Sequence, residues 1–268
     1  MRKDAKRALV IGYGSIGQRH ARILGELGCK VGVVSHRRIG IPNAFKDMKK
    51  ALASHVPDYV VIANRTSEHF RTLKKLQALQ FRGVVMIDKP LFRRVERFNP
   101  WKFKRVVVGY NLRFHPLILK LRKLLTGKRI LTAQTYAGKN LAAWRPGVDY
   151  RKSYSAFKDY GGGVLRDLSH ELDYMNWILG GWKSVTAVGG HYSRLAIETD
   201  DAFCMMMKTK RCENVLVQMN YIDHAGHRAM IFNSDDITVK VDLLNGWIEV
   251  NGKREAKKVE RDDTYREE

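Results

Sequence analysis

The sequence lacks a long apolar run, a regular cysteine pattern and an export signal. No apolar stretch approaches the roughly 20 residues that a membrane-spanning helix needs, so we expect no membrane partner. Cys29, Cys204 and Cys212 stand apart, without the C-x-x-C spacing of a zinc site, and they indicate neither a bound metal nor a disulfide framework. The basic N-terminus leads directly into an apolar strand, with no separate apolar region or cleavage site. These absences favour a cytoplasmic protein.

Acidic residues are scarce relative to basic ones. The 27 Asp and Glu residues are outnumbered by 49 Lys and Arg residues, which gives the 268-residue chain a formal net charge of +22. The basic residues concentrate in Arg93–Arg105 and Lys120–Arg129. Such a surface attracts phosphates, nucleotide-linked sugars or nucleic acid, and it is equally compatible with an ordinary solvated surface. No helix-turn-helix, RNA-binding signature or zinc module accompanies the charge, so we do not expect a nucleic-acid partner.

The first specific pattern lies near the N-terminus. Ala8–Ile11 is an apolar run too short for a helix and is predicted to be a buried strand, and helical spacing begins at Ser15. Between them, Gly12, Gly14 and Gly17 form the pattern G-x-G-x-x-G, which after a strand and before a helix is typical of dinucleotide binding. Such glycines permit a tight turn, the approach of backbone N–H groups to a pyrophosphate and close packing of the helix. The alternative is an ordinary glycine-containing turn.

The end of the next predicted strand, Val31–Ser35, bears on the choice of nicotinamide cofactor. A fold that prefers NAD usually places a carboxylate here to bind the ribose 2′-hydroxyl. This strand instead ends with Ser35, followed by Arg37 and Arg38, and offers no acid. A hydroxyl and two guanidinium groups suit a 2′-phosphate better, so we expect NADP as the preferred cofactor and NAD as the second choice.

Strands and helices alternate throughout residues 1–112. This alternation predicts an α/β fold whose first domain is a doubly wound, mostly parallel sheet that binds a dinucleotide. Ligands of such sheets bind beyond the carboxyl ends of the strands. The residues that we expect to contact the cofactor follow those strands or open the next helix: Gly12, Gly14, Ser15, Ile16, Gly17, Ser35, Arg37, Arg38, Asn64, Arg65, Thr66, His69 and Lys89.

The remainder, residues 113–268, has a different character. Short strands dominate after residue 184 and predict one mostly antiparallel sheet in a second, α+β domain for substrate binding and oligomerisation. A helix covers one face of this sheet in our prediction, and Met205 and Met207 lie on the other, which a second copy of the chain would cover in a homodimer or a dimer of dimers.

That helix is predicted to run from Val164 to Leu179, directly after three consecutive glycines. Leucines and one methionine at three- and four-residue steps form its core stripe, and Asp167, His170 and Tyr174 fall on a different face. A carboxylate, an imidazole and a phenol on one face suit acid–base chemistry, although a solvated helix face gives the same pattern. The candidate substrate contacts are Tyr110, Asn111, Arg113, Trp144, Arg145, Asp149, Tyr150, Arg151, Asp167 and His170.

Four segments, in order along essentially the whole chain, resemble the Gfo/Idh/MocA family of NAD(P)-dependent sugar oxidoreductases. They are residues 12–20, 64–69, 88–90 and 161–170. Residues 109–116 and 144–151 are similar to a branch often associated with surface-polysaccharide sugars. The chain departs from the family pattern in three ways: Asp88 replaces a glutamate, Asp167 precedes His170 by three residues where many members have four, and the chain ends where members usually continue through terminal helices.

The resemblance implies that Lys89 and His170 are catalytic, with Asp167 as the accompanying acid. The implied reaction transfers a hydride between the nicotinamide and a sugar or nucleotide-sugar carbon, with His170 exchanging the proton and Lys89 stabilising charge on the reacting oxygen. The alternative is a cofactor- or sugar-sensing regulatory protein of the same fold that does not turn over substrate.

Overall fold

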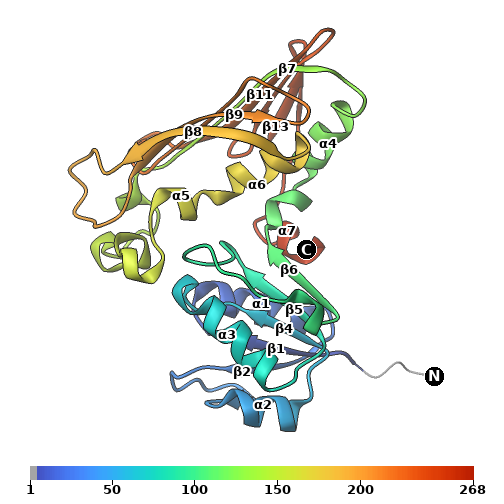
Figure 1. Ribbon diagram of the computed structural model, residues 1–268, viewed down its shortest axis with the longest axis vertical. Helices are drawn as coiled ribbons and strands as arrows, with labels where there is room; N and C mark the ends of the chain where they lie inside the picture. Colours follow the sequence, from blue (N-terminus) through green and yellow to red (C-terminus); the bar gives the residue numbers. More distant parts are fainter. Residues whose placement is uncertain (1–4) are drawn as a thin grey trace. The chain divides into compact units, whose positions relative to one another are not determined.

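Figure 1 shows the computed structural model, in which residues 5–268 are described. The chain divides into two compact units, of which the first ends at Gly109 and the second spans Tyr110–Glu268. The boundary expected from the sequence lay after residue 112. None of the helices in residues 5–268 has the length and hydropathy to cross a bilayer.

The first unit is a parallel sheet of six strands in the order β3–β2–β1–β4–β5–β6, with helices on it, as expected for a doubly wound fold. The strands are β1 (Arg7–Ile11), β2 (Lys30–Val34), β3 (Ala44–Phe45), β4 (Tyr59–Ile62), β5 (Val84–Asp88) and β6 (Arg105–Gly109). The helices are α1 (Ser15–Glu26), α2 (Met48–His55) and α3 (Thr66–Ala78), with a 3-10 turn η1 (Pro100–Lys102) before β6.

The central strands of this sheet are apolar throughout because both of their faces are buried. In β1, Leu9 and Ile11 join one hydrophobic cluster, which includes residues of α2 and α3. Val10, between them, joins a second cluster, against which Ile16 and Leu24 of α1 pack. Alternate side chains of a strand point to opposite faces, so a strand covered on both sides reads as a continuous apolar run.

The second unit contains an eight-stranded sheet in the order β14–β13–β12–β11–β7–β10–β9–β8, in which only β7 and β10 pair in parallel. Its strands are β7 (Ile130–Gly138), β8 (Trp182–Gly190), β9 (Ala202–Thr209), β10 (Val215–Asn220), β11 (His227–Ser234), β12 (Thr238–Asp242), β13 (Trp247–Val250) and β14 (Lys253–Ala256). The mostly antiparallel sheet predicted from the sequence is therefore present.

Helices α4 (Pro116–Leu124), α5 (Val164–Asp167) and α6 (Ser169–Ile178) cover one face of this second sheet (Figure 1). Helix α7 (Asp263–Glu267) packs against the 3-10 turn η2 (Asn111–Phe114). The other 3-10 turns of this unit are η3 (Leu141–Ala143), η4 (Tyr150–Lys152), η5 (Tyr154–Ala156) and η6 (Lys158–Tyr160).

Two details of the second unit correct the sequence analysis. The helix expected over Val164–Leu179 is interrupted at Leu168, whose backbone leaves the helical conformation (φ −98°, ψ 25°). Met205 and Met207 lie on the covered face, each only 6% exposed, and the intervening Met206 is 65% exposed on the open face. The two-residue alternation along β9 therefore has the opposite phase to the one predicted from the sequence.

Candidate functional site

The glycine turn joins β1 to α1 at the carboxyl end of the first sheet. Gly12 has a φ of +99°, and a Cβ there would lie 2.6 Å from the backbone nitrogen of Asn64. A Cβ on Gly17 would lie 2.1 Å from the carbonyl oxygen of Gly12. Around Gly14, in contrast, nothing lies within 4 Å of a Cβ position. The chain itself therefore requires Gly12 and Gly17, but its packing leaves the space at Gly14 open.

The helix that follows this turn presents its N-terminus at the same place. Gly14 is the N-cap of α1 and makes no side-chain capping hydrogen bond, and the first turn contains no acidic residue. The first backbone N–H groups of a helix have no partner within the helix, and the helix dipole favours an anion there. Ser15 and Ile16 contribute the first residues of this turn, so the arrangement suits a phosphate group.

The end of β2 has the polar residues that the sequence singled out. Ser35 is buried, and its Oγ accepts a hydrogen bond of 3.1 Å from the backbone nitrogen of Arg37. Arg37 and Arg38 are exposed. The serine thus shapes the turn from which both guanidinium groups extend into solvent.

The turn after β4 leads to three more of the predicted residues, Asn64, Arg65 and Thr66. Arg65 is exposed and is the N-cap of α3, and Thr66 is buried as its first residue. Asn64 donates a 2.8 Å hydrogen bond from Nδ2 to Thr72. Within the part of the chain that the structure describes, its buried Oδ1 has no hydrogen-bond partner. An accessible donor on a ligand would satisfy this oxygen.

His69 connects the turns after β4 and β5, and Lys89 follows β5 directly. The His69 ring is 1% exposed and lies among backbone carbonyl oxygens of both turns. Burial raises the pKa of the neighbouring Asp88 carboxyl, against the opposing effect of the Lys89 ammonium group. The lysine side chain therefore lies next to a half-buried acid at the carboxyl end of the strand.

In the second unit, Asp167 is the centre of a buried hydrogen-bond cluster. Its Oδ1 accepts a hydrogen bond of 2.7 Å from the Tyr154 hydroxyl. Its Oδ2 accepts bonds of 2.6 Å from Ser155 Oγ and 2.6 Å from the Tyr221 hydroxyl. Burial, with the adjacent Asp167 carboxylate, raises the pKa of Tyr221 well above its usual value. The carboxylate therefore fixes three segments, η5, α5 and the end of β10, to one another.

The other two polar residues of the predicted helix face are also buried. His170, in the first turn of α6, is 7% exposed, and its ring packs edge-on against Tyr110 with a centroid distance of 5.5 Å. Tyr174 is completely buried, and its hydroxyl lies 2.8 Å from Thr135 Oγ1. Tyr174 is thus a core residue. Because Asp167, His170 and Tyr174 are all buried, they do not form a solvated helix face. Because the helix is interrupted at Leu168, they also do not lie on one face of a single straight helix.

Two candidate substrate contacts make hydrogen bonds within the second unit. Asn111 is buried and donates a 2.6 Å hydrogen bond to Thr264 on α7. Arg113 makes a bidentate pair with Asp173, with N–O distances of 2.7 and 2.6 Å. That hydrogen bond, together with the negative charge, raises the pKa of Arg113. Both residues therefore attach the start of the second unit to its later helices α6 and α7.

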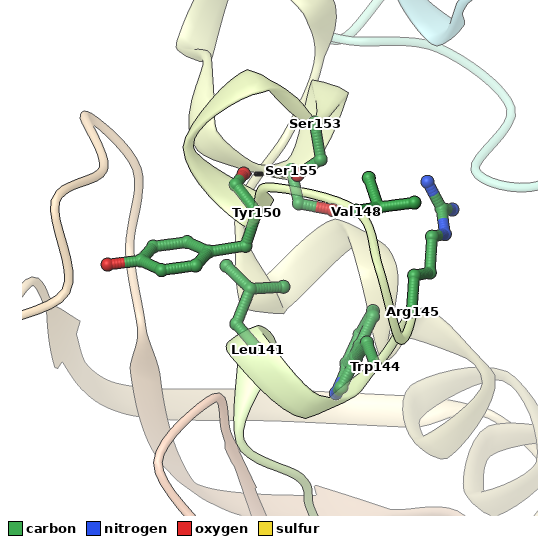
Figure 2. A pocket seen from close by; sticks show the side chains of 7 residues that line it. All are labelled: Leu141, Trp144, Arg145, Val148, Tyr150, Ser153 and Ser155. Atoms are coloured by element: carbon green, nitrogen blue, oxygen red, sulfur yellow. Dashed lines mark hydrogen bonds between the residues drawn. The ribbon is translucent and has the colours of Figure 1, made fainter.

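A pocket that opens to solvent lies beside the Asp167 cluster (Figure 2). It contains three of the candidate contacts and four residues that the sequence analysis did not name, and its lining residues are Leu141, Trp144, Arg145, Val148, Tyr150, Ser153 and Ser155. All seven come from residues 141–155, of which the sequence had indicated only residues 144–151.

The pocket wall is held by hydrogen bonds of its own. The Trp144 indole donates to the Lys139 carbonyl oxygen at 2.9 Å, and its ring packs edge-on against Tyr221. Ser153 Oγ donates to the Tyr150 carbonyl oxygen at 2.7 Å, as Figure 2 shows. The remaining two candidates, Asp149 and Arg151, form an ion pair with each other at 2.9 Å, in which the Arg151 hydrogen bond lowers the pKa of Asp149.

Across residues 5–268, no group of three or more His, Cys, Asp and Glu side chains is arranged to hold a metal ion. The chemical groups gathered in the two units are those of dinucleotide and polyhydroxyl binding: helix-terminal N–H groups, guanidinium groups, hydroxyls and aromatic rings.

The fold is similar to several solved oxidoreductases. An oxidoreductase from Thermotoga maritima matches with a TM-score of 0.81 and 18% identity, over 98% of this chain and 85% of that one. The UDP-N-acetylglucosamine 3-dehydrogenase GnnA from Acidithiobacillus ferrooxidans matches with a TM-score of 0.75 and 18% identity, over 99% and 86% of the two chains. The WlbA dehydrogenase from Bordetella pertussis, in complex with NADH and UDP-GlcNAcA, matches with a TM-score of 0.72 and 19% identity, over 97% and 80%.

The sequence itself gives the family. No curated protein matches the chain. The model of the GFO/IDH/MocA C-terminal domain matches residues 118–252, which make up half of the chain and most of the second unit. On this match, and with the motifs of the first unit in the expected order, the chain belongs to the Gfo/Idh/MocA family.

Proposed function

We propose that the protein is an NAD(P)-dependent oxidoreductase that transfers a hydride between a nicotinamide and a carbon bearing a hydroxyl or carbonyl group of a sugar or nucleotide sugar. The observation that supports this most directly is the contrast among the three glycines. Gly12 and Gly17 lack a Cβ because backbone atoms fill that space, whereas nothing in the chain fills the space at Gly14. A bound pyrophosphate is a reason for glycine at Gly14 that packing does not supply.

The cofactor proposed as preferred is NADPH. Arg37 and Arg38 are exposed at the end of β2, and no carboxylate follows the strand to bind a ribose 2′-hydroxyl. Arginine is well suited to phosphate because its guanidinium group donates two parallel hydrogen bonds. When bound, the cofactor would supply the hydride chemistry.

The substrate proposed is a sugar, alone or attached to a nucleotide. Two of the similar structures are a dehydrogenase of UDP-N-acetylglucosamine and a dehydrogenase in complex with UDP-GlcNAcA, which makes nucleotide sugars the first class to test. The pocket places aromatic rings and a guanidinium group side by side, from Trp144, Tyr150 and Arg145, and such groups suit the ring faces and hydroxyls of a sugar.

His170 and Lys89 receive the chemical roles. An imidazole accepts or donates a proton near neutral pH, so His170 is assigned the proton of the reacting hydroxyl. The Lys89 ammonium group is assigned hydrogen bonding to the reacting oxygen, where it stabilises developing negative charge. Asp167 is assigned a positioning role, because its carboxylate fixes the segment before α6 through three hydroxyl groups.

The test compares two glycine variants in NADPH binding and in stability. Gly14→Ala should fold like the parent, because its Cβ meets no atom, yet lose most of its NADPH affinity. Gly17→Ala should lose stability, because its Cβ would overlap the Gly12 carbonyl oxygen. NADPH binding by Gly14→Ala with the affinity of the parent would contradict a pyrophosphate at this turn.

Turnover is tested on the parent with a panel of sugars and UDP-sugars. His170→Ala should reduce single-turnover hydride transfer by about 10²–10⁴-fold, the usual contribution of acid–base catalysis, with NADPH affinity preserved. A parent that binds NADPH but reduces or oxidises nothing in the panel would favour the sensing protein over the enzyme.

A further inference from the structure

His69 lies between two turns that the proposed function uses separately. It belongs to the first turn of α3 and is 1% exposed. Its Nε2 lies 3.1 Å from the carbonyl oxygen of Asn64. Its Nδ1 lies 3.1 Å from the carbonyl oxygen of Pro90 and 3.2 Å from that of Leu91. One imidazole ring thus contacts backbone acceptors on both sides.

The strand order explains why one ring reaches both turns. β4 and β5 are adjacent and parallel, with Ile62 opposite Ile87, so Asn64 and Lys89 both follow strand ends at one edge of the sheet. On the other side of β4, β1 leads to Gly12, whose missing Cβ lets the Asn64 backbone approach. A continuous set of contacts therefore runs from the glycine turn, through Asn64 and His69, to the residues that follow Lys89.

We propose that His69 is a positioning residue: through Nδ1 it holds the turn that contains Lys89, and through Nε2 it holds the Asn64 turn beside the glycine loop. Its kinetic consequence rests on the proposed function. Carbonyl oxygens only accept, so Nδ1 and Nε2 donate to both turns at once when each nitrogen carries a proton, as in an imidazolium ring. In this role His69 acts through the two turns and is not the direct cofactor contact that the sequence suggested. Lys89 then depends on His69 for its placement, and NADPH affinity depends on the opposite end of the same ring.

Two conservative substitutions separate these contacts. The side-chain nitrogen of asparagine occupies nearly the place of the histidine Nδ1, and that of glutamine nearly the place of Nε2. His69→Asn therefore retains the donor toward Pro90 and loses the one toward Asn64. His69→Gln retains the donor toward Asn64 and loses the one toward Pro90.

The expected results of the two variants are opposite. His69→Gln should lower kcat, by up to about 10²-fold if Lys89 moves by roughly 1 Å, and should leave the NADPH dissociation constant close to that of the parent. His69→Asn should weaken NADPH binding by a larger factor than it lowers kcat. A general loss of stability would change kcat and NADPH affinity together and would not separate them in this way.

His55 provides a matched control in the same unit. It is also a buried helix histidine whose ring contacts backbone carbonyl oxygens, with Nε2 at 3.0 Å from Ala8 and 3.2 Å from Lys30. It lies on α2, which contacts β1, β2 and β3, away from the β4–β5 turns. His55→Asn should lower stability without separating kcat from NADPH affinity.

A readout independent of turnover keeps the inference distinct from the proposed function. Amide hydrogen exchange of residues 88–93, followed by mass spectrometry, should accelerate in His69→Gln and remain at the parent rate in His69→Asn. If the parent has no dehydrogenase activity, the proposed function fails, while exchange and NADPH binding still decide the role of His69. Equal exchange and equal NADPH affinity in the two His69 variants would overturn the inference.

Discussion

Replacing Asp167 with alanine should be among the most destabilising single substitutions in the second unit. The carboxylate is 4% exposed and accepts three hydrogen bonds of 2.6–2.7 Å. Its removal leaves the hydroxyls of Tyr154, Ser155 and Tyr221 without this acceptor. Tyr221 and Ser155 are buried at 0% and 2% exposure, whereas Tyr154 is partly exposed and can turn to water.

The magnitude follows from the two buried hydroxyls. A buried polar group that loses its partner costs about 1–3 kcal/mol, which gives about 2–6 kcal/mol for the pair. Relief from burying the carboxylate offsets part of this cost. We therefore expect a loss of about 3 kcal/mol in the free energy of unfolding, equivalent to a decrease of roughly 6–12 °C in Tm.

The assay is urea unfolding followed by tryptophan fluorescence. In a Trp101→Phe background, the four remaining tryptophans all belong to the second unit, so the signal reports that unit alone. Asp167→Asn retains one carbonyl acceptor and should lose less stability than Asp167→Ala. Asp235→Ala, at an exposed position, is the control and should change stability by less than about 0.5 kcal/mol. Equal urea midpoints for Asp167→Ala and Asp235→Ala would refute the reasoning.

Three further predictions concern the cofactor, pH and assembly. The parent should bind NADPH more tightly than NADH, and joint replacement of Arg37 and Arg38 by alanine should remove most of the difference in titrations; equal parent affinities would exclude a 2′-phosphate site there. Burial, aided by Arg19, lowers the pKa of His20 from 6.5 to about 4. Between these pH values the unfolded chain binds a proton at His20 that the folded chain does not bind. The free energy of unfolding therefore falls as the pH decreases from about 6.5 to 4. Between pH 7 and pH 5 the parent should lose about 2 kcal/mol more than His20→Gln in urea titrations, and parallel losses would be inconsistent with a neutral buried ring. The open face of the second sheet exposes Met206, and we expect a homodimer or dimer of dimers through it, so Met206→Asp should shift sedimentation toward the 30.8 kDa monomer; a parent that is already monomeric at micromolar concentration rules this out.

The first unit was largely predictable because its signals are local. Continuous apolar runs indicate β1, β4 and β5, because a strand that is buried on both faces has no polar side chains at alternate positions. The glycine pattern was recognisable for the same reason, because turn, strand and helix are consecutive. The sequence analysis missed β3, which has only two residues, Ala44 and Phe45. Its pairing with β2 depends on where the chain returns to the sheet, which two residues do not encode.

In the second unit, the succession of short strands in the sequence was enough to predict a mostly antiparallel sheet. It did not determine which phase of β9 is buried, because Met205, Met206 and Met207 are chemically identical, and only the helices on one face distinguish them. The break at Leu168 has a comparable origin, since local spacing favours one helix while the buried partners of Asp167 come from other segments.

The candidate site shows the same division. The sequence pointed to Gly14, Lys89 and His170 as candidates, because each belongs to a local pattern or to a segment that resembles the family. The partners of Asp167 were not identifiable, since Tyr221 is 54 positions away and has no motif around it. Likewise, His69 was recognised as a possible cofactor contact, but its ring contacts Pro90 and Leu91 because β4 and β5 are neighbours in the sheet. Local patterns identify residues suited to the chemistry, and the packing of distant segments decides which of them are buried, paired and held in place.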